Sequence, residues 1–277
     1  VDEITGQITP TTIISCIKKN KIKNINALIN MYHGGYPENI NDIYKLKKKY
    51  NFLIIEDACH ALGSQYKYNK RFLKVGSCKH SDVCTFSLHP LKSITSGEGG
   101  IVTTNNFEIA KNINLFRNHG ISRNKKKHWE YDVLNNGYNY RLSDINCALG
   151  LSQLKKINIF IRERKKVYRE YYFSLKKLNV KIPKYSNFIK PSFHLFFINL
   201  QTNRLKDKQK FIIHLKNNHI LAQQHYIPIY KFKVYKELIN NFSGAEKFFK
   251  NTISLPIFVG LNKKKLHKII QAIKKYF

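Results

Sequence analysis

The stretch 52–100 constrains the fold of this chain more than any other. It contains two apolar runs, FLII at 52–55 and DVCTFSL at 82–88, which have the length and composition of buried strands. Glu56 and Asp57 follow the first run directly, and HPLKS and the glycine-rich turn SGEGG follow the second. Because ligands of open parallel sheets bind beyond the carboxyl ends of the strands, we expect Asp57 and Lys92 to project into one crevice.

A carboxylate and an amine in one crevice are the two groups that pyridoxal phosphate (PLP) requires. The amine binds its aldehyde, and the carboxylate keeps its ring nitrogen protonated. At about 4 Å and an effective dielectric near 20, that carboxylate stabilises the ring cation by roughly 4 kcal/mol, or about three pKa units. Ser87, at the end of the second run, has a hydroxyl suited to a phosphate oxygen. Singly, the aspartate fits a helix cap and the lysine a solvated surface; the combination favours a PLP site.

The elements around this stretch predict a parallel sheet. A helix is expected from Thr9 and Pro10, a strand at 25–32, and a helix at 38–50 with Ile40, Ile43 and Leu46 at helical spacing. Strand, helix and strand at this spacing form a βαβ unit. A further strand at 99–105 and a helix at 107–120 follow.

The second half predicts a smaller α+β domain. We expect a long polar loop at 121–138 with Trp129, and then a helix capped by Ser143 or Asp144 that continues to about Leu178. We place a PLP-binding large domain at 1–158 and a small C-terminal domain at 159–277. The small domain has a predicted strand at 192–200 and a strand that leads into a loop within 220–230. It also has predicted helices at 206–218 and 261–277, and a helix followed by an extended segment within 245–258.

The formal charge of +32 has two interpretations. One is a nucleic-acid-binding protein. However, the lysines are spread along the whole chain beside abundant Asn, Ile, Tyr and Phe, which favours a compositional bias. The electrostatic field of this positive charge would also attract an anionic sugar nucleotide. The nucleic-acid-binding protein stays as the alternative function.

The cysteines indicate a reducing compartment. The five of them form no CxxC pair, which fits the cytoplasm better than a disulfide framework. Cys78, His80 and Cys84 match no standard zinc spacing, so we predict no metal site. No apolar run approaches the ~20 residues that a membrane-spanning helix needs, and we expect no membrane partner.

Two motifs in the central stretch resemble a known family. EDACHALGS, followed by TFSLHPLKSITSGEGG, is similar to the sugar aminotransferases of the DegT/DnrJ/StrS type, a branch of the fold-type I PLP enzymes. The resemblance implies that Asp57 pairs with the ring nitrogen of PLP, His60 contacts the ring hydroxyl, Ser87 binds the phosphate and Lys92 bonds to the cofactor. It also implies an α/β fold with a mostly parallel sheet and flanking helices, plus the smaller domain.

The resemblance continues beyond these motifs. In GYNYRLSD it implies that Asn139 reaches the phosphate of the partner's cofactor across a homodimer interface. In QQHYIPIY it places His225 and Tyr226 near the mouth of the site, where they and His89 are candidate substrate contacts.

The resemblance also suggests a substrate. FRNHGI, WEYD and GYNYRLSD are most similar to family members that serve pseudaminic acid biosynthesis. These move an amino group from an amino acid, with glutamate expected, to carbon 4 of a UDP-linked 4-keto-6-deoxy sugar. Lys92 is present, which argues against the branch of the family that lost this lysine and acts as dehydratases.

The chain opens at VDEITGQI without a Met, which suggests a fragment. The family has further cofactor contacts in an N-terminal portion, so we expect an N-terminally incomplete large domain with an exposed apolar sheet edge. An inactive fragment of such an aminotransferase is therefore a further alternative.

Overall fold

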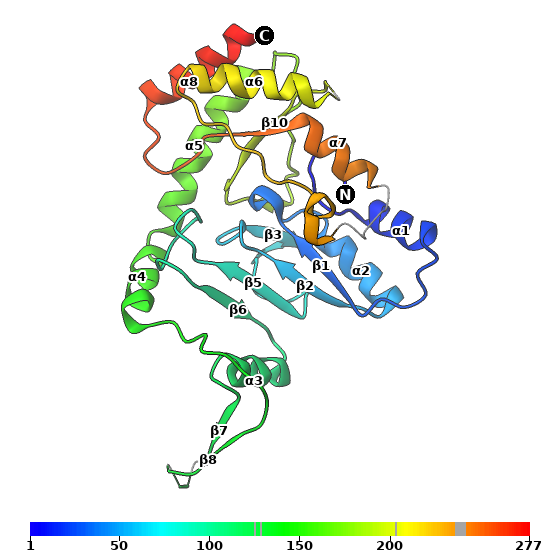
Figure 1. Cartoon of the computed structure of the whole chain (residues 1–277), viewed down its shortest axis with the longest axis vertical. Helices are drawn as coiled ribbons and strands as arrows, with labels where there is room; N and C mark the ends of the chain where they lie inside the picture. The colour runs from blue at the N-terminus through cyan, green and yellow to red at the C-terminus, as the bar shows by residue number, and fades with distance from the viewer. Residues whose placement is uncertain (125, 128, 203, 236–241) are drawn as a thin grey trace.

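A four-stranded sheet carries the residues singled out above. In the computed structural model, which describes residues 1–124, 126–127, 129–202, 204–235 and 242–277, its strand order is β1-β2-β5-β6 (Figure 1). The strands β1 (Ala27–Met31), β2 (Leu53–Asp57) and β5 (Val83–Ser87) are parallel, and β6 (Gly100–Thr103) is antiparallel to β5. The predicted mostly parallel sheet is confirmed.

The two faces of this sheet differ in burial. Helices α1 (Pro10–Lys19) and α2 (Ile40–Tyr50) bury apolar side chains in the core that contains Ile54. The neighbouring side chain Leu53 is 50% exposed on the opposite face, because successive side chains of a strand alternate. β1 is an edge strand of this sheet, and its Ile29 is 65% exposed on the same face as Leu53.

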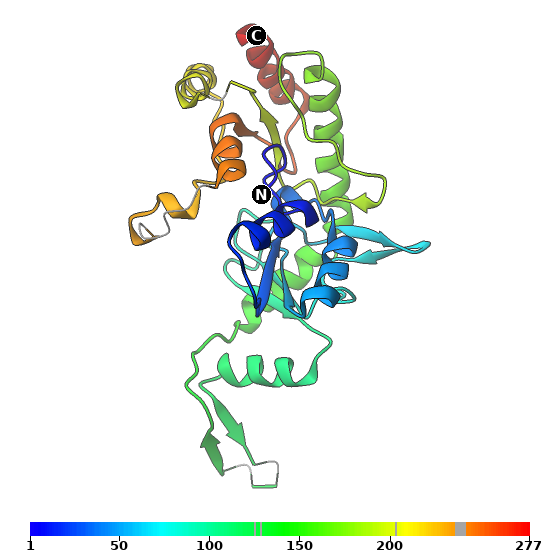
Figure 2. The same ribbon diagram turned by 90° about the vertical axis from the view of Figure 1, so that its right-hand side faces the viewer.

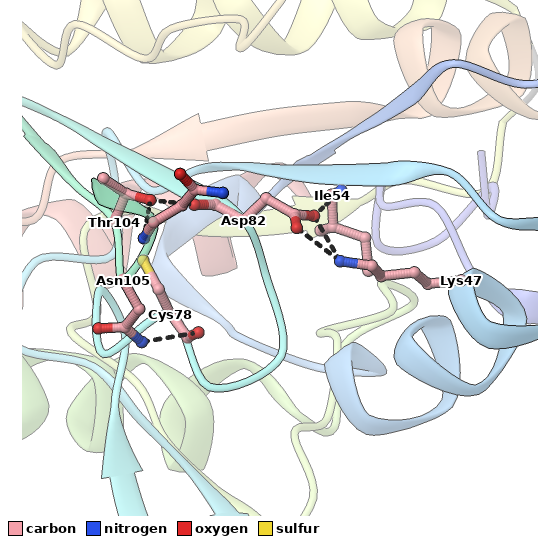
Figure 3. A network of polar contacts seen from close by, with 7 residues as sticks. Lys47, Ile54, Cys78, Asp82, Thr104 and Asn105 are labelled. Atoms are coloured by element: carbon pink, nitrogen blue, oxygen red, sulfur yellow. Dashed lines mark hydrogen bonds and ion pairs between the residues drawn. The ribbon is translucent and has the colours of Figure 1, made fainter. Parts of the chain in front are cut away.

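Asp82 fixes the amino end of β5, remote from the predicted site. Both carboxylate oxygens lie 2.6 Å from Lys47 Nζ of α2, and one accepts the Ile54 N–H at 2.7 Å (Figure 3). Its carbonyl oxygen accepts the Thr104 hydroxyl at 2.6 Å. Through these bonds one side chain ties α2 and β2 to β5, which supports the register that delivers Asp57 beside Thr85.

Two hairpins were not predicted. β3 (Gln65–Tyr68) and β4 (Arg71–Lys74) pair across a two-residue turn in which Asn69 has a left-handed φ of 54°. β3 also pairs with β9 (Ile189–Lys190). The predicted loop at 121–138 is wrong in part, because β7 (Ile121–Arg123) and β8 (Tyr131–Val133) pair within it.

The strands β7 and β8, together with α3 (Phe107–Phe116), form an arm that protrudes from the rest of the chain (Figures 1 and 2). After the arm the single predicted helix is wrong: α4 (Asp144–Leu154) ends before α5 (Ile157–Leu175) begins. Lys155 and Lys156 keep helical dihedral angles without continuing one helix.

The C-terminal part packs helices around a short antiparallel pair. β10 (Phe196–Asn199) pairs with β11 (Thr252–Leu255), and α6 (Leu205–Asn217), α7 (Ser243–Asn251) and α8 (Lys263–Tyr276) complete the part (Figure 1). The predicted strand at 192–200 is thus shorter than expected. The strand predicted at the start of 220–230 is wrong, because only an isolated bridge from Gln223 to Ser254 forms there. The 3-10 helices η2 (Ile229–Lys231) and η3 (Lys233–Tyr235) follow it. The domain boundary at 158/159 falls in the first turn of α5 and stays a prediction.

Candidate active site

The carboxyl ends of β2 and β5 place Asp57 and Ser87 on one face of the sheet. Asp57 pairs with Thr85 in the parallel register, and Ser87 is two residues further along β5. Glu56 points to the opposite face, where it is 1% exposed and accepts the Tyr32 hydroxyl at 2.7 Å. Burial raises the pKa of Glu56. Of the two adjacent acids, Asp57 therefore faces the site and Glu56 belongs to the core.

A backbone contact orients the Asp57 carboxylate. Its Oδ1 accepts the Cys59 N–H at 3.1 Å, a local turn of the kind that aspartate favours after a strand. The Cys59 side chain also hydrogen-bonds the Asp57 carboxylate. The residue that follows the strand in the chain thus holds the carboxylate in place.

A tight loop after β5 carries Lys92. The Leu88 N–H donates to the Gly99 carbonyl at 2.9 Å, the Ser96 N–H donates back to the Leu88 carbonyl at 3.0 Å, and the Lys92 N–H closes a turn on the His89 carbonyl at 2.9 Å. Gly99 has a φ of +147°, and a Cβ there would lie 2.9 Å from Leu142. The glycine-rich turn read in the sequence is therefore required to close this loop.

The Cys59 thiol lies within the fields of both charges. Burial raises its pKa to about 11, the Asp57 carboxylate acts in the same direction, and the Lys92 ammonium acts against it. The same lysine lowers the pKa values of His60 and His225, after burial in each case. The structure thus brings Asp57, His60, Lys92 and His225 together, although their elements are far apart in sequence.

His60 is buried, 1% exposed, and its ring contacts residues from several segments. The Gly34 N–H donates to its Nδ1 at 3.3 Å, and its Nε2 lies 3.0 Å from the Tyr226 hydroxyl. The ring of His194 stacks on it with 4.2 Å between centroids. Tyr226, predicted near the mouth of the site, is therefore in direct contact with a predicted cofactor residue.

Sequence reasoning missed His33, His194 and Arg164. Burial lowers the pKa of His33 to about 3, and its ring centroid lies 6.0 Å from that of His60. Arg164 is 6% exposed, and its Nη1 donates to the carbonyls of His194 and Ile257 at 3.2 and 2.9 Å. The HGG turn after β1 was the only usable signal, since nothing local marks the other two.

The remaining predicted residues have other contacts. The Ser87 Oγ accepts the His89 N–H at 3.4 Å, and His89 Nε2 is 3.8 Å from the exposed carboxylate of Glu98. Asn139 is exposed, and its backbone bridges to Asn118 at the base of the arm. Contact of Asn139 with a cofactor stays a prediction.

The residues present fit PLP in their chemistry. Asp57 offers a carboxylate at the end of β2, and the half-buried Lys92 lies near His60 and His225, whose pKa values are lowered. An acid for the ring nitrogen, an amine for the aldehyde and a hydroxyl at Ser87 thus converge on one face of the sheet.

A metal ion has no comparable site in the part of the chain that the structure describes, where no group of three or more His, Cys, Asp or Glu could hold one. Cys78 instead donates to the Thr103 carbonyl at 3.2 Å, and His80 hydrogen-bonds Tyr66. Within the same described residues, no helix is both long and apolar enough to span a membrane.

Comparison with known proteins identifies the family to which this chain belongs. The profile of the DegT/DnrJ/EryC1/StrS aminotransferase family matches residues 1–274. The UDP-4-amino-4,6-dideoxy-N-acetyl-beta-L-altrosamine transaminase of Campylobacter jejuni serotype O:23/36 is 37% identical over 98% of this chain and 72% of its own length.

Solved structures agree with this similarity. PseC of Helicobacter pylori, an aminotransferase of pseudaminic acid biosynthesis, has a TM-score of 0.87 and 31% identity, covering 100% of this chain and 72% of its own. The PLP-form of the sugar aminotransferase Spr1654 from Streptococcus pneumoniae has a TM-score of 0.80 at 24% identity, covering 90% and 68%; at this identity the likeness concerns the fold. Membership of this aminotransferase family indicates PLP as the cofactor.

Proposed function

Because the chain belongs to the DegT/DnrJ/EryC1/StrS aminotransferase family, we propose that it moves an amino group from an amino acid to carbon 4 of a nucleotide-linked 4-keto-6-deoxy sugar. L-Glutamate is the proposed donor, and a UDP-linked N-acetylaminosugar the proposed acceptor. Relatives named as transaminases of UDP-4-amino-4,6-dideoxy-N-acetyl-beta-L-altrosamine support the proposal, because such a 4-amino sugar is the product that this transfer would form.

One observation of the structure carries the proposal. Asp57 ends β2, and Lys92 lies in the loop after β5, the strand that pairs in parallel with β2, so an acid and an amine follow two adjacent strands. PLP supplies an electron sink that stabilises negative charge on the reacting carbon. The chain's own part is to hold the ring-nitrogen proton with Asp57 and to move a proton between carbon atoms with the Lys92 amine.

Absorbance spectroscopy tests this assignment. The protein is mixed with PLP beside its Lys92→Ala and Lys155→Ala variants, the second being a lysine of the α4–α5 junction. We expect a band of lysine-bound cofactor in the wild type and in Lys155→Ala that is absent in Lys92→Ala, and that bleaches when glutamate is added. A band in Lys92→Ala, or multiple turnovers by that variant, would contradict the role of Lys92.

We further propose a homodimer that shares its active sites. The arm and α4 expose large apolar side chains, among them Trp129 at 66%, Tyr131 at 63% and Ile145 at 83%. Asn139 lies at the base of this arm and apart from its own chain's cluster. We propose that Asn139 instead contacts the phosphate of the cofactor bound by the partner subunit.

Mixing two inactive variants tests the sharing. Lys92→Ala and Asn139→Ala subunits are dissociated, combined and reassociated. A mixed dimer regains one intact site if Asn139 acts on the partner, so activity should return. No recovery from a mixture shown to contain mixed dimers would contradict the shared site.

The proposed compartment is the cytoplasm. The five cysteines (Cys16, Cys59, Cys78, Cys84 and Cys147) are all free thiols in the structure. Free thiols persist where the environment is reducing.

A further inference from the structure

A chain of hydrogen bonds in the site begins at the backbone of Gly34. Its N–H can only donate, and it lies 3.3 Å from His60 Nδ1. Nδ1 must therefore be the acceptor and carry no proton. Since burial lowers the pKa of His60, the ring is neutral and its single proton is on Nε2.

The donor and the acceptor of the second hydrogen bond, between His60 and Tyr226, follow from the position of this proton. His60 Nε2 lies 3.0 Å from the Tyr226 hydroxyl oxygen. Because Nε2 carries the proton, it donates and the tyrosine oxygen accepts. The O–H of Tyr226 must then point elsewhere, and no other described residue accepts it. Burial, with the Asp57 carboxylate adding to it, raises the pKa of Tyr226, so the phenol keeps its proton at neutral pH.

The orientation of the His60 ring is set by a separate set of contacts. The His194 ring stacks on it at an interplanar angle of 29°. The Ser192 hydroxyl donates to the His60 carbonyl at 2.7 Å, and the His194 N–H donates to the Gly34 carbonyl at 2.9 Å. The segment 192–194 therefore holds the backbone of both Gly34 and His60 and packs on the His60 ring.

We infer that Tyr226 is a hydrogen-bond donor to an oxygen of the bound reactants, and that the Gly34–His60 chain fixes the direction of this bond. The inference rests on the proposed function, because that function supplies the acceptor. The Tyr226 side chain is 48% exposed, and its hydroxyl contacts His60, one of the predicted cofactor residues.

The acceptor is an oxygen atom that can be stabilised by a hydrogen bond from the neutral Tyr226 hydroxyl. Two sources carry such an oxygen: the ring hydroxyl group of the cofactor and the sugar of the nucleotide-linked substrate. His194 acts here as a positioning residue, since it reaches the reactants only through His60.

The direction of the chain is tested by nitrogen NMR on the full protein labelled with 15N-histidine, without added ligand. The His60 signals are assigned by their loss in His60→Gln. We expect Nδ1 to be unprotonated and Nε2 protonated at pH 7. A ring with the proton on Nδ1, or a charged ring, would overturn the inference.

The role of His194 is tested in the same spectra. His194→Phe keeps an aromatic ring for stacking and should leave the His60 tautomer unchanged. His194→Leu removes the ring and should give averaged His60 signals that report both tautomers. Identical His60 signals in the two variants would remove His194 from the inference.

The acceptor is tested with Tyr226→Phe, and Tyr276→Phe on α8 is the matched control. If the cofactor oxygen is the acceptor, the pH midpoint of the cofactor band shifts in Tyr226→Phe. If the sugar oxygen is the acceptor, the band is unchanged and the KM for the nucleotide sugar rises about tenfold, as for one lost hydrogen bond.

Two outcomes would contradict the inference, and they can be told apart. If both the band and the KM of Tyr226→Phe match those of the control, Tyr226 donates to neither reactant. If the wild type forms no band with PLP, the proposed function fails and the acceptor with it. The tautomer of His60 would still confirm or overturn the direction of the chain.

Discussion

At the scale of single residues, a substitution can remove the charge of Asp57 and keep the size and hydrogen bond of its side chain. In Asp57→Asn the side-chain oxygen can still accept the Cys59 N–H, so the turn after β2 should persist. The negative charge is lost, and with it about 4 kcal/mol of stabilisation of a ring cation at about 4 Å. We expect kcat to fall by roughly 10²–10³ while the melting temperature stays near that of the wild type.

The control for Asp57 is a nearby carboxylate on an exposed surface. Glu98→Gln removes a negative charge from the loop after β5, where the Glu98 side chain is 76% exposed. Its kcat should stay within about twofold of the wild type, because solvent screens such a charge. Equal losses of kcat in the two variants would show that the general field, and not the position of Asp57, matters.

His33 makes stability depend on pH. Burial lowers its pKa from an ordinary value near 6.5 to about 3. Between these values the unfolded chain binds more protons than the folded one, so the free energy of unfolding falls as the pH decreases. From pH 6.5 to pH 5 this residue should account for a loss of about 2 kcal/mol.

The measurement for His33 is the slope of unfolding free energy against pH, from urea titrations of the wild type and His33→Phe. A constant packing cost of the phenyl ring shifts the curve without changing its slope. The variant should therefore lose part of the slope, and the rest comes from other buried imidazoles such as His60 and His194, whose pKa values are also lowered. Parallel curves would contradict the assignment to His33.

Sequence could predict the residues whose position follows from strand ends. Asp57 and Lys92 each follow an apolar run, and the rule for parallel sheets brings such residues together. His194 and Arg164 have no such signal, because their place beside His60 depends on how the C-terminal part packs on the sheet. That packing is set by many apolar contacts of long sequence separation, which no local pattern contains.

At the scale of elements, the turn after β1 locks three segments together. Gly35 has a φ of +90°, and a Cβ there would lie 2.1 Å from Ser192 Oγ and 2.6 Å from the His60 carbonyl. Gly35→Ala must therefore separate these segments as well as adopt a conformation that favours glycine. We expect a loss of at least about 3 kcal/mol of unfolding free energy in urea titrations.

Gly260 offers a matched control for Gly35. It has nearly the same φ, +89°, but a Cβ there would meet nothing within 4 Å. Gly260→Ala should cost only the left-handed conformation, about 1 kcal/mol. If both variants lose the same free energy, the contacts with Ser192 and His60 do not contribute.

The elements that sequence missed share a physical cause. The β3–β4 hairpin and the β7–β8 hairpin consist of short strands with mixed polar side chains, so they lack the apolar alternation that marks a strand. The break between α4 and α5 has no proline or glycine at 155–156. The buried helices and parallel strands, by contrast, carry strong periodic patterns and were predicted.

At the scale of the whole molecule, α4 is a helix without a buried face. Although it contains Ile145, Leu149 and Leu151, none of its residues is buried in the single chain. A helix of this composition gains little from its own propensity and needs a packing partner. The proposed second copy would supply that partner.

Ile145→Asp tests whether α4 packs on a second copy, because this substitution should not destabilise α4 in the single chain. Ile145 is the second residue of α4, where a negative charge favours the helix dipole. The fold of the single chain should be unaffected, whereas a symmetric interface would receive two buried charges. We expect the dimer dissociation constant, from sedimentation equilibrium, to rise at least about a hundredfold.

Ile213→Asp is the control, since Ile213 is 56% exposed on α6 and outside the proposed interface. It should leave the dissociation constant within about threefold of the wild type. Weakening by Ile145→Asp alone locates the interface at α4, and activity should then fall with dissociation because Asn139 would lose its partner. Dissociation with full activity would instead show that each site is complete within one chain.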